Sequence, residues 1–256
     1  MTEKLYATEQ YQREVDATVV HVDPDEGVVV LDRTVFYPGG GGQPHDLGTL
    51  AIGDDRLDVV EVGHGAGGTV WHRVVTTDGT AAAVPGVGTS VRGEVDWDRR
   101  YRLMRTHTAM HALCGVVWER FGAPVTGGNM EPGEGRLDFE IPDWDGDRDR
   151  QPVEDELNAQ LAAGRPVEIA FLPREEADAD PSLIRTKVSL LPAGLRTVRV
   201  VDIVGLDRQA DGGTHVASTA EVGRVRVAKV DNKGRGFRRI RIALEDDGLG
   251  PVRVGR

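Results

Sequence analysis

The sequence has a single cysteine, Cys114, and lacks any run of about 18 apolar residues. One cysteine excludes an internal disulfide framework and fits a reducing cytoplasm. Without a long apolar run, we expect no membrane-spanning helix. The first residues also lack the basic and then apolar order of a signal peptide. From these absences we expect a cytoplasmic protein that does not enter a membrane.

Basic charge is scarce as well. The formal net charge is −11, and lysine occurs only at Lys4, Lys187, Lys229 and Lys233. Such an acidic excess keeps a protein soluble and is typical of adaptation to high salt. It argues against broad nucleic-acid binding, so we expect no binding to DNA. A local basic stretch near the C-terminus is the exception.

The first 95 residues are rich in short β-branched runs. Residues 15–22 and 28–32 flank an Asp-Pro-Asp-Glu-Gly turn, which predicts a hairpin. Further runs cover residues 57–62, 68–75 and 91–95. Several short strands at regular spacing predict a small barrel or sandwich.

Four consecutive glycines lie inside this region, in Phe-Tyr-Pro-Gly-Gly-Gly-Gly-Gln-Pro-His-Asp-Leu-Gly at residues 36–48. Glycine loses much conformational freedom on folding, so such a run suggests a loop that something must approach closely. The segment lacks the Lys-Ser/Thr of a phosphate loop. We take Gly41, Gly42 and Gln43 as candidate substrate-binding residues; a plain surface turn is the alternative.

Residues 100–121 predict a helix that carries two histidines, His107 and His111. Apolar or aromatic side chains recur at the spacing of one helical face, at Leu103, Met104, Met110, Cys114, Val117, Trp118 and Phe121. The two histidines fall on that face one turn apart, so one metal ion could bind both. Gly122 is placed to end the helix. The metalloprotease motif is excluded, because Thr108 stands where that motif has Glu; hydrogen-bonded core histidines are the alternative.

The chain then alternates between short strands and helices. Residues 135–141, 167–172 and 196–204 predict strands. Residues 143–150 read as a charged loop, and residues 153–163 as a helix with Pro152 in its first turn and Gly164 at its end. Residues 173–180 are acidic, and we expect them at the surface.

A second group of potential metal ligands follows, in Asp211-Gly-Gly-Thr-His215. Gly212 and Gly213 permit a tight turn in which both flanking side chains point inward. Together with the two helical histidines, Asp211 and His215 would offer three nitrogen ligands and one oxygen ligand, a plausible set for zinc. An ordinary turn is the alternative, and Cys114 and Gln209 are rival ligands.

The tail combines a strand at residues 224–230 with a basic stretch at residues 232–241. The candidate RNA-binding residues are Lys233, Arg235, Phe237 and Arg238. Basic side chains beside glycine suit phosphate contacts, and an aromatic ring can stack on a base. The alternative is a β-hairpin with a solvated basic turn.

The motifs at residues 36–48, 105–111 and 212–216 together resemble those of the AlaX family. These are free-standing alanyl-tRNA editing proteins related to the editing domain of alanyl-tRNA synthetase, and the resemblance covers most of the chain. It implies an α+β protein with a small N-terminal β-barrel domain, residues 1–95. An α/β editing domain would follow at residues 96–256, with an antiparallel sheet packed on helices.

The resemblance also implies a zinc ion held by His107, His111 and His215. The fourth family ligand is Cys, and here Asp211 takes its place; a carboxylate can still ligate zinc but can shift the metal preference. The implied partner is the acceptor end of tRNA(Ala), and we see no signal for oligomerisation, so we expect a monomer.

The implied reaction is hydrolysis of Ser-tRNA(Ala), with Gly-tRNA(Ala) as a further candidate substrate. A site for alanine cannot strongly reject serine, so a second site is needed. Thr108 is our candidate contact for the serine hydroxyl; a position on the helix surface is its alternative. The metal would activate water or position the aminoacyl group. Other readings are a tRNA-binding module with a decayed metal site, or a hydrolase of small esters.

Overall fold

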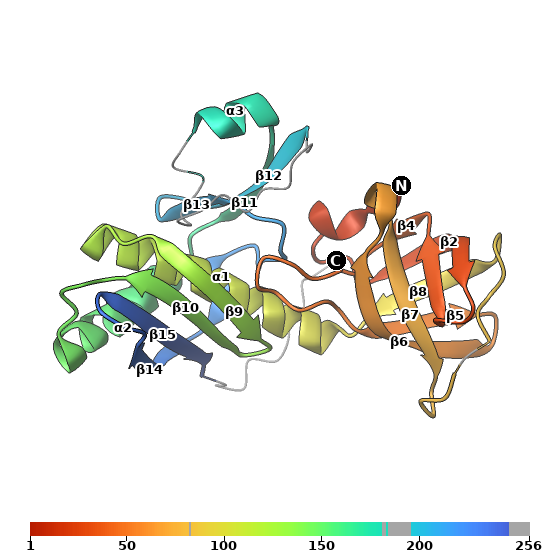
Figure 1. Ribbon diagram of the computed structural model, residues 1–256, viewed down its shortest axis with the longest axis horizontal. Helices are drawn as coiled ribbons and strands as arrows, with labels where there is room; N and C mark the ends of the chain where they lie inside the picture. Colours follow the sequence, from red (N-terminus) through yellow and green to blue (C-terminus); the bar gives the residue numbers. More distant parts are fainter. Residues whose placement is uncertain (82, 181–182, 184–195, 246–256) are drawn as a thin grey trace. The chain divides into compact units, whose positions relative to one another are not determined.

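The computed structural model describes residues 1–81, 83–180, 183 and 196–245 (Figure 1). The chain divides into two compact units, Met1–Arg100 and Tyr101–Arg256. Within the described part of the chain, no helix combines the length and the apolar character needed to cross a membrane.

The first unit is a closed antiparallel barrel, so the barrel alternative of the sequence analysis is confirmed. Its strands run in the order β2 (Glu14–Asp23), β3 (Val28–Leu31), β7 (Val70–Thr76), β6 (Asp55–His64), β5 (Gly48–Ile52) and β8 (Ser90–Val95). The expected β2–β3 hairpin is present. The short strands β1 (Glu3–Lys4) and β4 (Arg33–Thr34) form a parallel pair beside it, with 3-10 turns at Leu5–Ala7 and Ala66–Gly68.

Alternating side chains fill the barrel. On β2 the buried positions are Val15, Ala17 and Val19, with exposed or half-buried residues between them. Gly93 on β8 has a packing role, because a Cβ there would lie 2.9 Å from the ring of the fully buried Phe36. Strand β5 was not predicted, since Gly-Thr-Leu-Ala-Ile carries only a weak strand signal.

The second unit combines helices with two antiparallel sheets, as expected of an α+β protein. The larger sheet has the order β14 (Val225–Asn232), β15 (Phe237–Leu244), β10 (Glu134–Glu140) and β9 (Val125–Glu131). The smaller sheet has the order β11 (Val167–Pro173), β12 (Thr197–Ile203) and β13 (Asp207–Ala210). The helical elements are α1 (Trp97–Phe121), whose first turn belongs to the first unit, α2 (Gly146–Ala162), α3 (Arg174–Ala179) and the 3-10 turn Thr219–Val222.

Helix α1 packs directly on the larger sheet. A Cβ on Gly135 of β10 would lie 2.7 Å from Sδ of Met110, and one on Gly128 of β9 would lie 3.6 Å from Cε of the same side chain. The two glycines therefore let the helix approach the sheet closely. The segment containing Gly128 was not recognised as a strand, because paired glycines usually weaken one.

Two predictions for the middle of the chain were partly wrong. Helix α2 begins at Gly146, so part of the expected charged loop is helical and Pro152 lies inside the helix. Asp147 and Asp149 in the first turn favour this earlier start, because acidic side chains stabilise a helix N-terminus. The helix ends as predicted before Gly164, which has φ +65°. The acidic segment at residues 173–180 lies mostly at the surface, as expected, and contains the short helix α3.

Candidate metal centre

Helix α1 is buried almost all round, which differs from the single apolar face that its sequence predicts. Every residue from 103 to 117 is buried. The side opposite the larger sheet is covered too: a Cβ on Gly115 would lie 2.8 Å from Leu206, just before β13. Trp118, expected on the apolar face, is 42% exposed. His107 and His111 are therefore inside the unit, where a polar group needs a partner.

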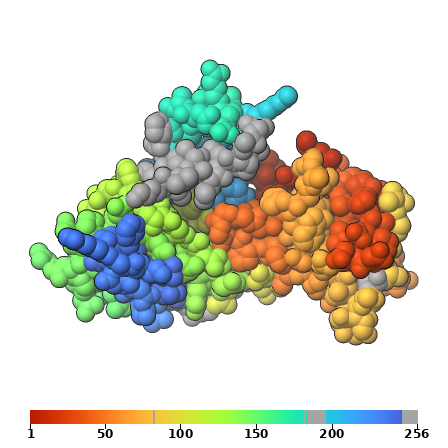
Figure 2. Space-filling view, viewed as in Figure 1, coloured from red at the N-terminus to blue at the C-terminus, as the bar shows by residue number. Residues whose placement is uncertain are grey.

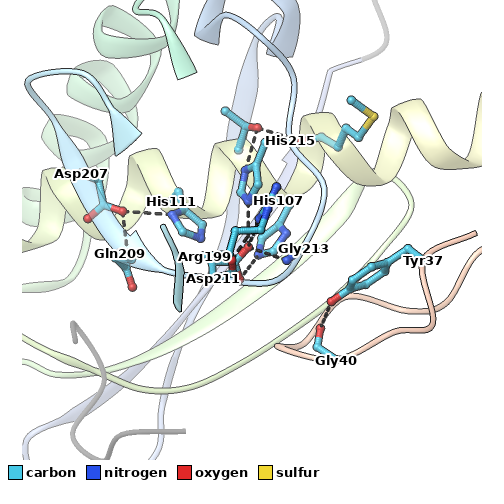
Figure 3. Close-up of polar contacts among 12 residues, drawn as sticks. Tyr37, Gly40, His107, His111, Arg199, Asp207, Gln209, Asp211, Gly213 and His215 are labelled. Carbon is cyan, nitrogen blue, oxygen red and sulfur yellow. Dashed lines mark hydrogen bonds and ion pairs between the residues drawn. The ribbon is translucent and has the colours of Figure 1, made fainter. Parts of the chain in front are cut away.

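The four predicted metal ligands lie together. One ligand atom each from His107, His111, Asp211 and His215 falls within 4.8 Å of all the others. Figure 3 shows the two helical histidines meeting the loop that follows β13. The rings of His107 and His111 have centroids 5.1 Å apart, and His111 and His215 are separated by 4.8 Å.

The spacing of these atoms fits a metal ion. Zinc bonds of about 2.0–2.1 Å in a tetrahedron place neighbouring ligand atoms about 3.4 Å apart. Nε2 of His215 lies 3.1 Å from Oδ2 of Asp211, and Nε2 of His107 lies 3.6 Å from Oδ1. Three imidazoles and a carboxylate are a donor set that zinc accepts. Within the described residues, the rival Cys114 is buried but is not part of the cluster.

The surroundings of this centre favour the unprotonated forms of two of its histidines. Burial lowers the pKa of His107 to about 4. Burial, reinforced by His107, also lowers the pKa of His215 well below its usual value. Although burial opposes ionisation of Asp211, the neighbouring histidines outweigh it and hold the pKa of this carboxyl well below its usual range. The imidazoles of His107 and His215 are therefore neutral at neutral pH, and each has an unprotonated nitrogen that a metal ion can bind.

His111 differs from the other two histidines. Its Nδ1 lies 3.1 Å from Oδ2 of Asp207 on β13. Burial alone would lower the pKa of His111, but the hydrogen bond and charge of Asp207 raise it. Gln209 donates from Nε2 to the same carboxylate oxygen over 2.7 Å. Gln209, considered above as a rival ligand, thus supports Asp207 (Figure 3).

Asp207 was missed by the sequence analysis. Asp207 and Gln209 alternate on β13 and both are buried, at 3% and 9% exposure. Two polar residues at strand spacing before the Asp-Gly-Gly turn are the signal that could have identified them. That signal is weak, because burial of both residues arises only from tertiary packing.

The Asp-Gly-Gly turn is held by its own carboxylate and by an arginine. The N–H of Gly213 donates to Oδ2 of Asp211 over 2.7 Å. Arg199 on β12 donates from Nη1 to the carbonyl oxygen of Asp211 over 3.0 Å, and the same nitrogen lies 3.8 Å from Oδ2. Gly212 is exposed and Gly213 is buried. Their predicted role in substrate binding stays a prediction.

Thr108 is fully buried, so its alternative as a residue on the helix surface is wrong. Its Oγ1 lies 2.9 Å from the carbonyl oxygen of Met104 and 3.2 Å from Nδ1 of His215. It also accepts the N–H of Val216 over 3.3 Å. The hydroxyl is therefore engaged within the protein, and its predicted contact with a serine substrate stays a prediction.

The glycine-rich segment belongs to the first unit, where it forms an ordered loop. Residues 39–42 are all glycines with positive φ, a conformation that other residues rarely adopt. Backbone groups of Gly40 and Gln43 pair reciprocally over 3.0 and 2.9 Å. Gln43 is 2% exposed, whereas Gly41 is exposed and Gly42 is half-buried. Their predicted role in substrate binding is likewise a prediction.

A buried ion pair closes this loop. Asp46 accepts the N–H of Tyr37 over 2.6 Å and pairs with Arg100, in the first turn of α1. The guanidinium of Arg100 also donates to the carbonyl oxygens of Val35, over 2.6 Å, and Gln10, over 3.2 Å. Both charged side chains are fully buried, so removal of either one would leave the other as an uncompensated buried charge.

Of the predicted RNA-binding residues, Lys233 and Arg235 lie in the turn between β14 and β15, and Phe237 and Arg238 begin β15. Figure 2 shows this hairpin, in blue, on the surface of the second unit. The side chains of Lys233 and Arg235 are exposed, and Phe237 is half-buried. Arg238 donates to the carbonyl oxygen of Phe237 over 3.0 Å. A hairpin with a basic turn is thus observed, and RNA binding stays a prediction.

Comparison with known proteins links the whole chain to alanyl-tRNA metabolism. Residues 2–99 match the family model of class II (A) tRNA synthetases, and residues 198–241 match that of the threonyl and alanyl tRNA synthetase second additional domain. The chain is 38% identical over 241 residues to the alanyl-tRNA editing protein AlaX-M of Saccharolobus solfataricus, covering 94% of this chain and 98% of the relative.

Two further relatives extend the comparison. The AlaX-M protein of Methanosarcina acetivorans is 38% identical over 248 residues, which covers 96% of this chain and all of the relative. The alanine–tRNA ligase of Pyrobaculum aerophilum is 36% identical over 240 residues, 90% of this chain but only 25% of the ligase.

Proposed function

The chain belongs to the AlaX-M family of alanyl-tRNA editing proteins, and from this premise we propose that it deacylates mischarged tRNA(Ala). The proposed substrate is Ser-tRNA(Ala), with Gly-tRNA(Ala) as a second candidate. The observation that carries the proposal is the convergence of His107, His111, Asp211 and His215 on one point. We assign the reaction to a domain at residues 96–256 and the barrel domain to residues 1–95.

The proposed cofactor is one zinc ion held by the three histidines and Asp211. Bound there, it would supply a Lewis acid that activates water or polarises and positions the aminoacyl ester. The ionised carboxylate of Asp211 would offset part of the ion's charge. Asp211 stands where the family has Cys. Its place within the cluster supports a working site over a decayed one.

The proposed partner is the acceptor end of tRNA(Ala), met by a monomer in the cytoplasm. Lys233 and Arg235 support this, because among the described residues neither pairs with a carboxylate. Their neighbours differ: Arg239 donates to both oxygens of Asp138, over 2.6 and 2.7 Å, and Arg241 pairs with Asp231 over 2.9 Å. The free positive charge therefore concentrates at the hairpin turn, where phosphates could reach it.

Deacylation assays test the proposal. Purified protein would be mixed with Ser-, Gly- and Ala-tRNA(Ala), with and without a chelator. We expect hydrolysis of the serine ester, sparing of the alanine ester, loss of activity with chelator and recovery with added zinc. Binding of tRNA without hydrolysis would instead favour a binding module with a decayed site. Equal hydrolysis of simple amino-acid esters would favour a hydrolase of small molecules.

A further inference from the structure

A histidine binds a metal ion only through a nitrogen that carries no proton, so the tautomer of each ring decides which atom is offered. In this centre two of the three rings have their Nδ1 atoms directed at buried oxygen atoms from other elements. His111 faces Asp207 on β13, and His215 faces Thr108 on α1. The two oxygens come from residues outside the cluster of ligands.

The proton on His111 can be assigned from its partner. A neutral imidazole that binds a metal ion through Nε2 carries its one proton on Nδ1, and Oδ2 of Asp207, 3.1 Å from Nδ1 of His111, can accept that proton in a hydrogen bond. Its Nε2 then carries the lone pair. The side chain of Asp207 is completely buried, and Gln209 donates to the same Oδ2 over 2.7 Å. This second hydrogen bond holds the carboxylate in the orientation that meets His111 (Figure 3).

The proton on His215 follows from the groups around Thr108. The hydroxyl has a single hydrogen, and the carbonyl oxygen of Met104, 2.9 Å away, can only accept it. Once that hydrogen is used, Oγ1 accepts from its other neighbours, the N–H of Val216 at 3.3 Å and Nδ1 of His215 at 3.2 Å. With a metal ion bound, Nε2 of His215, 3.1 Å from Asp211, would be a ligand, so the one proton of the neutral ring would lie on Nδ1, where Oγ1 of Thr108 can accept it.

We propose that Asp207 and Thr108 are positioning residues of the metal centre. Each holds one histidine in the tautomer protonated at Nδ1, so that Nε2 of His111 and Nε2 of His215 point at the ion. Both residues act through the histidines and lie outside the cluster of metal ligands. This inference rests on the proposed function only through the bound metal, and it gives Thr108 a role distinct from recognition of serine.

Zinc binding by the purified full-length chain tests the inference without requiring any substrate. Apparent zinc affinity would be measured by competition with a chromogenic chelator. Removing a partner that orients a metal-binding histidine typically weakens metal affinity about 10- to 100-fold. We expect this loss in Asp207→Ala and in Thr108→Val, which keeps the shape of threonine but lacks the hydroxyl.

Two further variants separate positioning from folding. Thr108→Ser keeps the hydroxyl, and we expect its zinc affinity to stay within about threefold of the wild type, far from the loss expected on removing the partner. Asp202→Ala is the matched control in the same sheet, because Asp202 lies on β12 beside Arg208 and outside the cluster. Circular dichroism would verify the fold of every variant.

Nitrogen NMR of the imidazole rings gives a readout that a purely structural role would not move. In the zinc-bound wild type we expect a proton on Nδ1 of both His111 and His215. In Thr108→Val we expect only the His215 signal to change, and in Asp207→Ala only that of His111. Protons on Nε2 in the wild type would overturn the inference.

The outcomes distinguish this inference from the proposed function. Zinc binding by the wild type with unchanged affinity in both Asp207→Ala and Thr108→Val overturns the positioning role alone. Zinc binding with the expected losses but no deacylation of Ser-tRNA(Ala) supports the positioning role and overturns the proposed function. A wild type that binds no zinc overturns the inference together with the metal-dependent part of the function.

Discussion

The imidazole rings of His107 and His215 stack face to face, with centroids 4.3 Å apart and an angle of 26° between their planes. One ring comes from helix α1 and the other from the loop after β13. Two protonated rings could not stack in this way inside the protein without strong repulsion. At least one of the two rings is therefore neutral, and burial lowers the pKa of both, which favours the unprotonated nitrogens that metal binding requires.

Removal of a stacked histidine should abolish the metal centre. We expect His215→Ala to bind zinc more than about 100-fold more weakly than the wild type, since it loses a ligand and not only a supporting contact. Metal analysis of the purified protein would measure this, with His21→Ala on the exposed side of β2 as the control. Full zinc occupancy in His215→Ala would contradict the assignment of the ligands.

The carboxylate of Asp211 can be tested against the thiolate that the family uses. We expect Asp211→Asn to lose zinc and deacylation activity, because the amide carries no charge. Asp211→Cys should keep zinc, because thiolate is a softer ligand that zinc also accepts. Metal content and the rate of Ser-tRNA(Ala) hydrolysis would be compared. Full metal and full activity in both variants would mean that Asp211 has no role at the site.

The buried pair of Arg100 and Asp46 should dominate the stability of the first unit. Removing one partner leaves an uncompensated buried charge, so we expect Asp46→Ala to lower the free energy of unfolding by about 3–5 kcal/mol. Urea unfolding of the full chain would measure the change. Replacing both residues by apolar ones, as in Arg100→Met with Asp46→Leu, should lower the free energy of unfolding by less than the single change does. A larger loss in the double variant would contradict this account.

The buried His72 should make the first unit sensitive to acid. Its Nε2 lies 2.9 Å from Oγ1 of Thr34, and burial lowers its pKa from 6.5 to about 4. Between these values only the unfolded chain binds the proton, so the free energy of unfolding falls as the pH falls from 6.5 to about 4. Two and a half pKa units correspond to at most about 3 kcal/mol.

Urea unfolding at pH values from 7 down to 4.5 would reveal this dependence. The control is His72→Gln, which cannot take up the proton. We expect a shallower pH dependence in this variant, whatever its stability at pH 7. Parallel curves for the two proteins would show that His72 does not contribute.

The basic hairpin turn should contribute to tRNA affinity without affecting the metal. We expect Lys233→Glu with Arg235→Glu to weaken tRNA binding, and to reduce the slope of log affinity against log salt by about one for each lost phosphate contact. Zinc content should be unchanged. Arg148→Glu, on the exposed surface of α2, is the charge-matched control for either single change, Lys233→Glu or Arg235→Glu. Equal effects of the turn and control variants would indicate a nonspecific charge effect.

Local spacing was enough to predict the parts of this protein whose causes are local. The two histidines one turn apart, the glycines after α1 and α2, and the alternating strands of the barrel follow from the geometry of a single segment. The joint resemblance of three motifs to those of one family then linked segments that are distant in the sequence. The prediction that His107, His111, Asp211 and His215 converge also came from the sequence.

Tertiary packing decided what no single segment contains. The burial of α1 on all sides depends on glycines of β9 and β10 and on Leu206, which are remote in the sequence. The contact of Asp207 with His111 and that of Thr108 with His215 also join separate elements. A ligand can be recognised from its residue type and spacing. The group that orients it depends on a hydrogen bond of fixed length and direction, which forms only after the elements have packed.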